Sequence, residues 1–333
     1  MATEATPQEV QVNRRWRYHD TLHSVPKLMS EIMSAYSGVS EHEQISHITK
    51  VRNEAYAQFP YPCMGTFRFL ELDLSRHDAY EEHVLGPLRQ PAVPGKPEPL
   101  FLDCGCCLGQ DIRKLAVDGV PPERLWASDI EPRFIELGFE LFRDGHKLPR
   151  DHFLCPGNLL AEAGDPSEEV EDRLTVLDDR VTVLNITAVF HLFDLDEQKR
   201  IAHRCLRLLR KDSGDDQPVL VLGAQVGGRE AQRVRRAYND KFRYVHTAES
   251  WEALWREVCG QPRWRDRVAA VEVRSRMLEG ARERENISSS GDGDAANNQH
   301  ELVAAAAASD ADPAAVGGAR LWQRFEVWVT FKS

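Results

Sequence analysis

One glycine-containing turn carries the residue types and spacing that could do chemistry. It has the form D-x-G-x-x-x-G from Asp103 to Gly109, and it lies between an apolar segment and a helix-like segment. Gly105 permits a tight turn and close approach of a ligand, and the backbone N–H groups at a helix start can bind polar groups. The next apolar segment ends at Asp129, whose carboxylate can accept hydrogen bonds from both hydroxyls of a ribose. The pattern predicts a site for a nucleoside cofactor.

The details of the turn favour S-adenosylmethionine over a dinucleotide. A dinucleotide turn usually reads G-x-G-x-x-G, and its second glycine lets the backbone approach a pyrophosphate; here that position is Cys107. Asp103 would repel a pyrophosphate, whereas it can accept from an ammonium group and attract a sulfonium. Three alternatives stay open: glycines and Asp129 that serve only turn geometry, an NAD(P)-dependent oxidoreductase, and a non-catalytic cofactor-binding scaffold.

Other candidate groups concern the methyl acceptor. His191 follows an apolar segment, Val181–Phe190, that is typical of a central parallel strand. It is either a base or hydrogen-bond donor to the acceptor, or a histidine whose hydrogen bonds are satisfied by backbone. The loop that contains Tyr61, Met64 and Phe67 could cover a hydrophobic acceptor, although an aromatic cluster is more often core. Phe190, next to His191, is the fourth predicted acceptor contact.

No metal site is expected. The cysteines at 104, 106 and 107 are adjacent in one strand-to-helix turn, so they cannot all converge on a tetrahedral ion, and no C-x-x-C partner or His pair lies nearby in the sequence.

The elements that position these residues read as an α/β domain behind a helical extension. Apolar residues at helical spacing in 28–36 predict one helix, and a capping box of Ser40 with Glu43 opens a second. Alternating prolines make 59–65 a loop rather than a helix. From residue 100 onward strands alternate with helices, and the chain ends with two strand-like segments. The predicted strands cover 100–103, 125–130, 181–190, 219–222, 271–277 and 321–331.

These elements divide the chain into five parts. We expect a loosely tied arm over 1–26, a helical cap or lid over 27–89, and the cofactor-binding core over 90–280, entered through a proline-rich linker. Residues 281–320 contain no Phe, Trp or Tyr and are rich in Ala, Gly, Asp, Asn and Ser, which predicts a disordered insertion in a hairpin. Residues 321–333 form the last core strand.

The amino-acid composition limits the classes of partner that the protein is expected to bind. With 42 Lys and Arg against 53 Asp and Glu, the formal net charge is −11, which argues against binding to nucleic acid or to anionic membranes. The sequence lacks an apolar run long enough for a membrane span and lacks the pattern of a signal peptide, so we expect a cytoplasmic location. Seven cysteines, an odd count, are typical of reduced thiols.

The motifs, taken in order, resemble those of class I S-adenosylmethionine-dependent methyltransferases. They are the glycine turn, Asp129, Asn158 after Phe153-Leu154, and the run from Phe190 to Phe193, followed by two C-terminal antiparallel strands. More narrowly, four segments are similar to fungal methyltransferases of secondary-metabolite pathways, including meroterpenoid biosynthesis. These are YPCMG at 61–65, CGCCLGQD at 104–111, ELFRD at 140–144 and HLF at 191–193. The resemblance covers roughly 27–280 and the final strand.

This resemblance implies a Rossmann-like fold, with a mostly parallel seven-stranded sheet, helices on both faces and an N-terminal helical extension. It implies that the glycine turn, including Cys107, lines the methionine and ribose part of the cofactor. Asp129 and Ile130 would hold the ribose, and Asn158 and Leu159 would flank the adenine. Asn158 departs from the more usual Asp, although its carbonyl can still accept from the adenine amine.

The same resemblance implies O-methylation of a small, mostly apolar natural product of terpenoid or polyketide type. A carboxylate is the expected acceptor, because it is already ionised at neutral pH. The alternative is a phenol or alcohol, for which His191 would act as base. The expected partner is this small molecule; a homodimer is compatible with the sequence.

Overall fold

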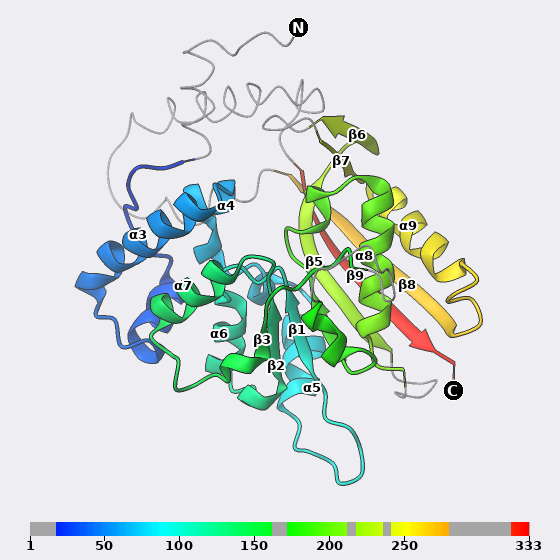
Figure 1. The fold of residues 1–333 in the computed structure, drawn as a ribbon, viewed down its shortest axis with the longest axis horizontal. Helices are drawn as coiled ribbons and strands as arrows, with labels where there is room; N and C mark the ends of the chain where they lie inside the picture. Colours follow the sequence, from blue (N-terminus) through cyan, green and yellow to red (C-terminus); the bar gives the residue numbers. More distant parts are fainter. Residues whose placement is uncertain (1–17, 162–171, 212–217, 236–240, 280–320, 333) are drawn as a thin grey trace, which may run out of the picture.

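The computed structural model describes residues 18–161, 172–211, 218–235, 241–279 and 321–332. Its centre is a seven-stranded sheet in the order β3-β2-β1-β4-β5-β9-β8 (Figure 1). β1 to β5 run parallel, whereas β9 pairs antiparallel with both β5 and β8. The strands are β1 Phe101–Cys104, β2 Leu125–Ser128, β3 Phe153–Leu154, β4 Val183–Asn185, β5 Val219–Gly227, β8 Val268–Glu279 and β9 Leu321–Phe331. The predicted mostly parallel seven-stranded sheet is confirmed.

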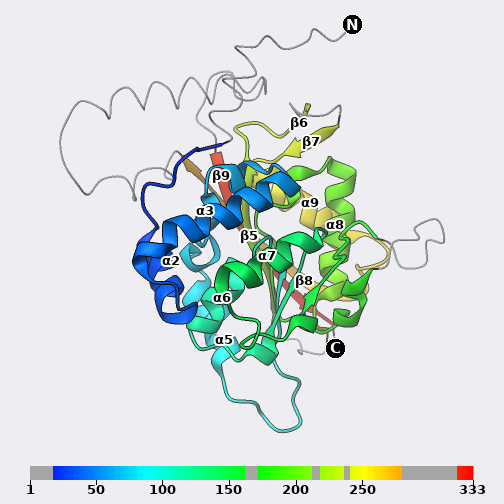
Figure 2. The same cartoon turned by 60° about the vertical axis from the view of Figure 1, so that its left-hand side comes forward.

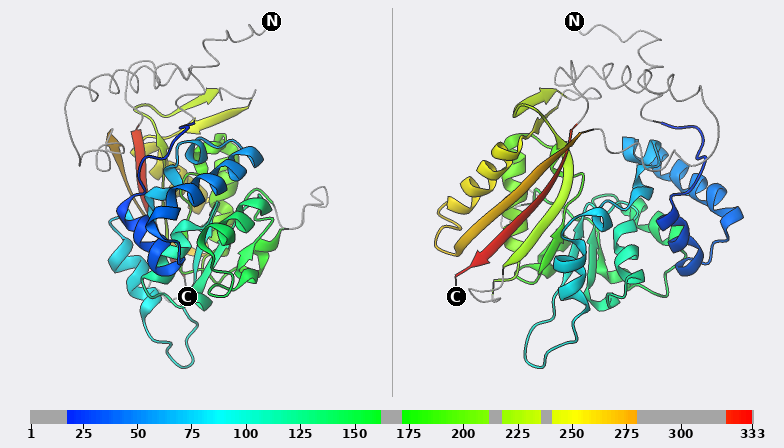
Figure 3. Two further views of the ribbon diagram at one scale, coloured as in Figure 1. Left: turned by 90° about the vertical axis from the view of Figure 1, so that its left-hand side faces the viewer. Right: turned by 180° about the vertical axis from the view of Figure 1, so that it is seen from behind.

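Helices cover both faces of this sheet because successive strand residues point to opposite sides and both sides are apolar. Leu220 and Leu222 pack toward one core cluster with residues of α6 Gln110–Val117 and α7 Pro132–Phe142. Val219 and Val221 pack toward the other cluster, with α8 Leu195–Leu208 and α9 Ala248–Gly260. Figure 3, right, shows α9 alongside the outer strands β8 and β9. Short 3-10 turns complete the connections: η5 Pro122–Arg124, η6 Arg150–His152, η7 Arg173–Leu177 and η8 Phe190–Leu192.

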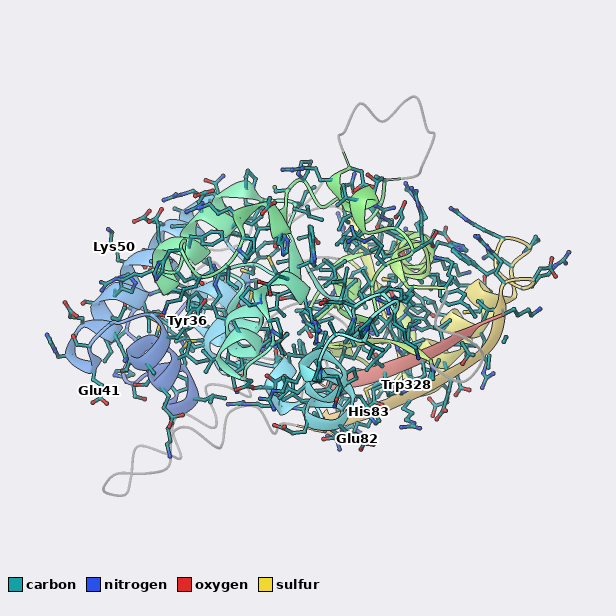
Figure 4. The ribbon with its side chains drawn as sticks, turned by 90° about the horizontal axis from the view of Figure 1, so that it is seen from below. Tyr36, Glu41, Lys50, Glu82, His83 and Trp328 are labelled. Atoms are coloured by element: carbon teal, nitrogen blue, oxygen red, sulfur yellow. The ribbon has the colours of Figure 1, made fainter. Side chains whose placement is uncertain are left out.

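The N-terminal extension forms a further helical layer. Figure 2 shows α2 and α3 in front of α6 and α7, and buried side chains of α3 and α7 share one apolar cluster. The layer comprises α2 Lys27–Glu31, the π-helix η1 Ile32–Tyr36, α3 Glu41–Gln58, α4 Pro62–Gly65, η2 Arg68–Glu71, η3 Leu74–Arg76, the π-helix η4 Tyr80–Leu85 and α5 Gly86–Arg89. Figure 4 labels His83 of η4, in this extension, and Trp328 of β9, in the sheet; their rings lie edge-on with centroids 4.7 Å apart.

Several local predictions need correction. Ser40 precedes α3 as expected, but its hydroxyl donates to the Glu43 carboxylate instead of capping a backbone N–H, so the predicted box does not form. The proline loop contains one helical turn, because Pro62 occupies its first position, where a missing N–H costs nothing. The predicted strand 181–190 pairs only over Val183–Asn185 and an isolated bridge at Val181, although the segment stays apolar beyond them.

The C-terminal half contains one hairpin that was predicted and one that was not. Strands β8 and β9 pair from Glu279 with Leu321 onward, which confirms the predicted hairpin. The predicted disordered insertion, 281–320, lies outside the described residues, and so does the predicted arm before Tyr18. A second hairpin, β6 Gln232–Arg235 with β7 Phe242–Val245, was not predicted. Among the described residues, no helix has the length and apolarity needed to cross a lipid bilayer.

Candidate functional site

The glycine turn and Asp129 form one hydrogen-bonded unit at the carboxyl ends of β1 and β2. The N–H groups of Gly105 and Cys106 donate to the Ser128 carbonyl at 2.8 and 2.9 Å. The N–H of Cys107 donates to Asp129 Oδ2 at 2.8 Å, and the N–H of Glu131 donates to Oδ1 at 3.0 Å. Asp129 therefore caps the turn, as one alternative holds, but each carboxylate oxygen keeps a second lone pair for a ribose hydroxyl.

The turn requires glycine at its first glycine position. Gly105 has φ of +72°, in the left-handed region that side chains avoid. A Cβ there would lie 2.6 Å from Cγ2 of Val189, which comes from the loop after β4. The backbone of the turn is thus in close contact with the segment between β4 and His191.

Three buried carboxylates surround the turn, at Asp103, Asp111 and Asp129, each 7% exposed or less. Among the described residues none of them forms an ion pair with Lys, Arg or His. Burial raises the pKa of Asp103 to about 7, opposed by the amide of Asn185, which donates to it at 2.7 Å, and helped by the Asp129 charge. Burial raises the pKa of Asp129 to about 6, opposed by the N–H groups that it accepts from. Burial also raises the pKa of Asp111 well above its usual value; the Asp103 and Asp73 charges add to this shift, whereas the N–H of Leu74 and the Arg68 charge oppose it.

Buried carboxylates without cations are costly, and a cationic ligand would relieve that cost. Two more buried groups beside the turn have no hydrogen-bond partner, Oγ of Ser128 and Oε1 of Gln110. The acceptor groups at this edge therefore suit a ligand that has positive charge and several hydroxyl or amine groups. Within the described ranges, no group of three or more His, Cys, Asp or Glu side chains could hold a metal ion.

The segment after β3 lies against the same edge. The N–H of Gly157 donates to the Asp129 carbonyl at 2.8 Å, and a Cβ on Gly157 would lie 2.7 Å from Cβ of Ser128. Asn158 follows, and its Oδ1 accepts from the N–H of Leu160 at 3.0 Å. The structure thus brings the segment predicted to flank adenine next to Asp129. Leu159 is buried here, whereas Ile130 is 54% exposed.

His191 does not directly follow the central strand, as predicted, because β4 ends at Asn185 and a loop intervenes before η8. Its Nδ1 accepts from the N–H of Val226 on β5 at 3.4 Å, and its ring centroid lies 6.2 Å from that of Trp322 on β9. His191 therefore lies over β5 and β9, on the other side of β4 from the glycine turn and Asp129.

Three of the four predicted acceptor contacts are core residues. Phe190 is fully buried, with its ring 4.9 Å from Trp251 and 6.3 Å from Phe325. Met64 is also fully buried, and Phe67 packs under the guanidinium of Arg52. These positions correct the predicted contacts, because apolar packing already occupies the side chains.

Tyr61 is the predicted contact that remains partly exposed. Its ring packs on Phe59 at 4.2 Å and on Phe134 of α7 at 5.9 Å. Phe59 is 42% exposed, so the two rings form an apolar surface at the end of α3.

Other residues of the site had no sequence signal that singled them out. Asn185 ends β4 and holds Asp103, and Val189 closes over Gly105. Arg68 places its guanidinium 4.1 Å from the Trp322 ring centroid, although the two residues are far apart in the sequence. Asn185 lies inside the predicted strand 181–190, so the sequence did not mark it as a strand-end residue, the position at which polar side chains often line a ligand site.

Comparison with known proteins identifies relatives of this chain. Residues 17–70 match a family described as meroterpenoid methyltransferase N-terminal domain. The chain is 35% identical over 233 residues to O-methyltransferase phiE from Fungal sp. (strain ATCC 74256), an alignment that covers 70% of this chain and 71% of phiE. It is 33% identical over 227 residues to asnovolin E/chermesin D methyltransferase nvfJ from Aspergillus novofumigatus, covering 68% and 74%. Phosphoethanolamine N-methyltransferase 2 from Haemonchus contortus, a solved structure, is 13% identical with a TM-score of 0.43, covering 91% of this chain and 60% of that one.

Proposed function

Because this chain belongs to the family of fungal secondary-metabolite methyltransferases that includes phiE and nvfJ, we propose that it transfers a methyl group from S-adenosylmethionine to a carboxylate of a small, mostly apolar natural product. The observation that carries the cofactor assignment is the unit formed by Gly105, Cys107 and Asp129 at the ends of two adjacent parallel strands. Ligands of open α/β sheets bind at this edge. The family favours methyl transfer over the oxidoreductase alternative.

The chain's residues fit the parts of this cofactor. Asp129, with Ile130, would bind the ribose hydroxyls, and Asn158 with Leu159 would flank the adenine. Asp103 would attract the cationic methionine end, and Gly105 and Gly109 would allow the backbone to approach it. When bound, S-adenosylmethionine supplies an electrophilic methyl carbon on a sulfonium: the acceptor oxygen bonds to this carbon as the S–C bond breaks, and the electron pair goes to sulfur.

A carboxylate acceptor needs little from the protein beyond alignment. It is already ionised at neutral pH, and its charge is neutralised together with that of the sulfonium as the bond forms. Alignment alone can supply about 7–11 kcal/mol of the barrier reduction. The name of phiE, an O-methyltransferase, supports oxygen as the methylated atom.

His191 would orient the acceptor. Its Nδ1 accepts from the N–H of Val226, and a neutral ring bonded in this way carries its proton on Nε2. Such a ring donates a hydrogen bond and does not accept a proton at Nε2. The second candidate function, methylation of a phenol or alcohol, would instead need a ring that accepts the acceptor's proton.

We also propose a cytoplasmic location, which the seven free cysteines support, since all of them lie in described parts of the chain and none forms a disulfide. The net charge of −11 supports a small molecule over nucleic acid as partner.

The test is to incubate the protein with methyl-labelled S-adenosylmethionine and an organic-acid fraction of a fungal extract. The expected product is a small apolar molecule whose label is released by mild alkali, as from a methyl ester. Label that survives alkali in a small molecule would favour the phenol or alcohol, and label in protein or nucleic acid would overturn the substrate class.

A further inference from the structure

The segment from Phe67 to Asp73 is held in an uncommon backbone conformation. Phe67 and Leu72 bracket η2 with φ of +59° and +53°, and neither is glycine. Left-handed backbone is unfavourable for residues other than glycine, so surrounding contacts must hold it. Phe67, Phe69, Leu70 and Leu72 are all buried, and this packing holds the segment. Between the two left-handed residues, the segment places the Arg68 guanidinium over Trp322 of β9.

Arg68 has part of its hydrogen-bonding capacity unused. Its guanidinium lies over the Trp322 ring at 4.1 Å, and its Nη2 donates to the Asp73 carboxylate at 2.5 Å. Its Nε is buried and has no hydrogen-bond partner within the described part of the chain. A guanidinium has five N–H groups, so a single oxygen of Asp73 leaves donors for a second carboxylate.

The place of Arg68 along the sheet separates it from the ribose site. Asp129 follows β2, whereas Trp322 begins β9, and β1, β4 and β5 lie between these strands. Trp322 pairs with Val226 of β5, whose N–H meets His191. Arg68 and His191 therefore both lie near the Trp322 ring. An acceptor bound near this ring would lie on the other side of β4 from Asp129.

A second arginine lies near Trp322. Arg324, two residues after Trp322, lies directly opposite Arg276 of β8. Like charges directly opposite each other are unfavourable in a sheet. Asp78 balances Arg276 at 2.8 Å, whereas no ion pair of Arg324 occurs in the described ranges. Burial and the Arg276 charge lower the pKa of Arg324, and the charges of Asp73 and Asp78 oppose this shift. Arg324 thus adds positive charge near Trp322, which Asp73 and Asp78 partly offset.

We propose that Arg68 binds the acceptor's carboxylate group, with Trp322 beneath the guanidinium. This inference rests on the proposed function. The buried Nε and a remaining guanidinium N–H would hold the carboxylate group, while Asp73 fixes the guanidinium plane. The enzyme would then select acids over neutral analogues of the same size, because a neutral group leaves the buried donor unpaired.

The test uses the full chain saturated with S-adenosylhomocysteine, with dodecanoate and dodecan-1-ol as matched probes. Calorimetry should show that the wild type binds dodecanoate at least tenfold more tightly than the alcohol. Arg68→Gln should abolish this preference, and Arg68→Lys should restore part of it. Arg256→Gln, which removes an exposed arginine of α9 paired with Glu252, should keep the full preference. A merely structural arginine would not change acid-over-alcohol selectivity.

The affinity for S-adenosylhomocysteine is measured first in each variant, because it distinguishes a failure of the Arg68 proposal from a failure of the proposed function. Unchanged affinity in Arg68→Gln is expected. A loss that spares 5′-methylthioadenosine, which lacks the amino-acid carboxylate, would assign Arg68 to the cofactor and overturn the proposal. Equal binding of both probes by the wild type, or acid preference in Arg68→Gln, would also overturn it. A wild type that does not bind S-adenosylhomocysteine would instead refute the proposed function. Should Arg68→Gln unfold, Arg68→Lys is measured instead and should prefer dodecanoate less strongly than the wild type does; a full preference in Arg68→Lys would overturn the proposal.

Discussion

The backbone N–H of Cys107 donates to Oδ2 of Asp129 at 2.8 Å. This bond joins the turn after β1 to the carboxylate after β2, so the shape of the turn and the position of the ribose acceptor depend on each other. A change in either one should alter cofactor affinity.

Gly105→Ala should reduce both stability and cofactor affinity. The substitution adds left-handed strain at φ of +72° and a Cβ only 2.6 Å from Val189 Cγ2. Gly38 provides a matched control, since its φ is +65° and a Cβ there would meet nothing within 4 Å. Gly38→Ala should cost about 1–2 kcal/mol of strain, and Gly105→Ala roughly 1–3 kcal/mol more from crowding. Denaturant unfolding gives both values; equal losses would mean that Val189 yields without cost.

Affinity for S-adenosylhomocysteine should depend on pH through Asp103. Its pKa of about 7 in the unliganded protein means that ionisation is incomplete below neutral pH. A cationic amino-acid end binds the ionised form, so affinity should fall about tenfold from pH 8 to pH 6 through Asp103, and about twentyfold in the wild type once Asp129 is included. Asp103→Asn should bind weakly and flatten this dependence to about the twofold expected from Asp129, with its pKa of about 6. Calorimetry at several pH values checks both; an unchanged slope in the variant would exclude Asp103 as the titrating group.

Asp103→Asn, which should weaken cofactor binding, should increase the stability of the unliganded protein at high pH. The folded pKa of Asp103 lies above the value of about 3.9 for an unfolded chain. Its contribution to stability is therefore complete below pH ~4 and is lost as pH rises toward ~7. Asp103→Asn should raise the melting temperature of the unliganded protein at pH 8 but not at pH 4. A lower melting temperature at pH 8 would mean that the charge is compensated in a way the structure does not show.

His191→Asn distinguishes the two acceptor types. With a carboxylate acceptor, the variant should keep substantial activity from pH ~6 to ~8, because no proton has to leave the acceptor. With a phenol or alcohol, it should lose most of kcat together with a pH-rate inflection near 6.5. Measuring kcat against pH for the wild type and the variant, with one acceptor, distinguishes the two acceptor types.

The segment 283–318 can be replaced by a short glycine-containing turn. The ends that the turn must join are adjacent, because Glu279 pairs with Leu321 in the β8–β9 hairpin. The replaced sequence has no aromatic residue, so we expect melting temperature and cofactor affinity to stay nearly unchanged. A large loss of either would show that the segment packs on the core.

The cofactor side of the site could be predicted because its signals are local. Asp103, Gly105 and Asp129 follow apolar strand patterns within short stretches, and parallel strands bring such ends together. The acceptor side could not, since Arg68 meets Trp322 only through tertiary packing. Hydrophobic content also does not show where strand pairing ends, which is why the whole segment 181–190 was predicted to be one strand. The β6–β7 hairpin is rich in arginine and lacks strand alternation.

Calorimetric titration of S-adenosylhomocysteine into the wild type and Asp129→Ala tests the central claim most directly. The wild type should bind, and the variant should bind about 1.5–3 kcal/mol more weakly, because the ribose hydroxyls lose a charged acceptor and Cys107 loses its hydrogen-bond partner. Circular dichroism should show that the variant remains folded. Equal affinity in the two proteins, or a wild type that binds a nicotinamide dinucleotide instead, would contradict the account.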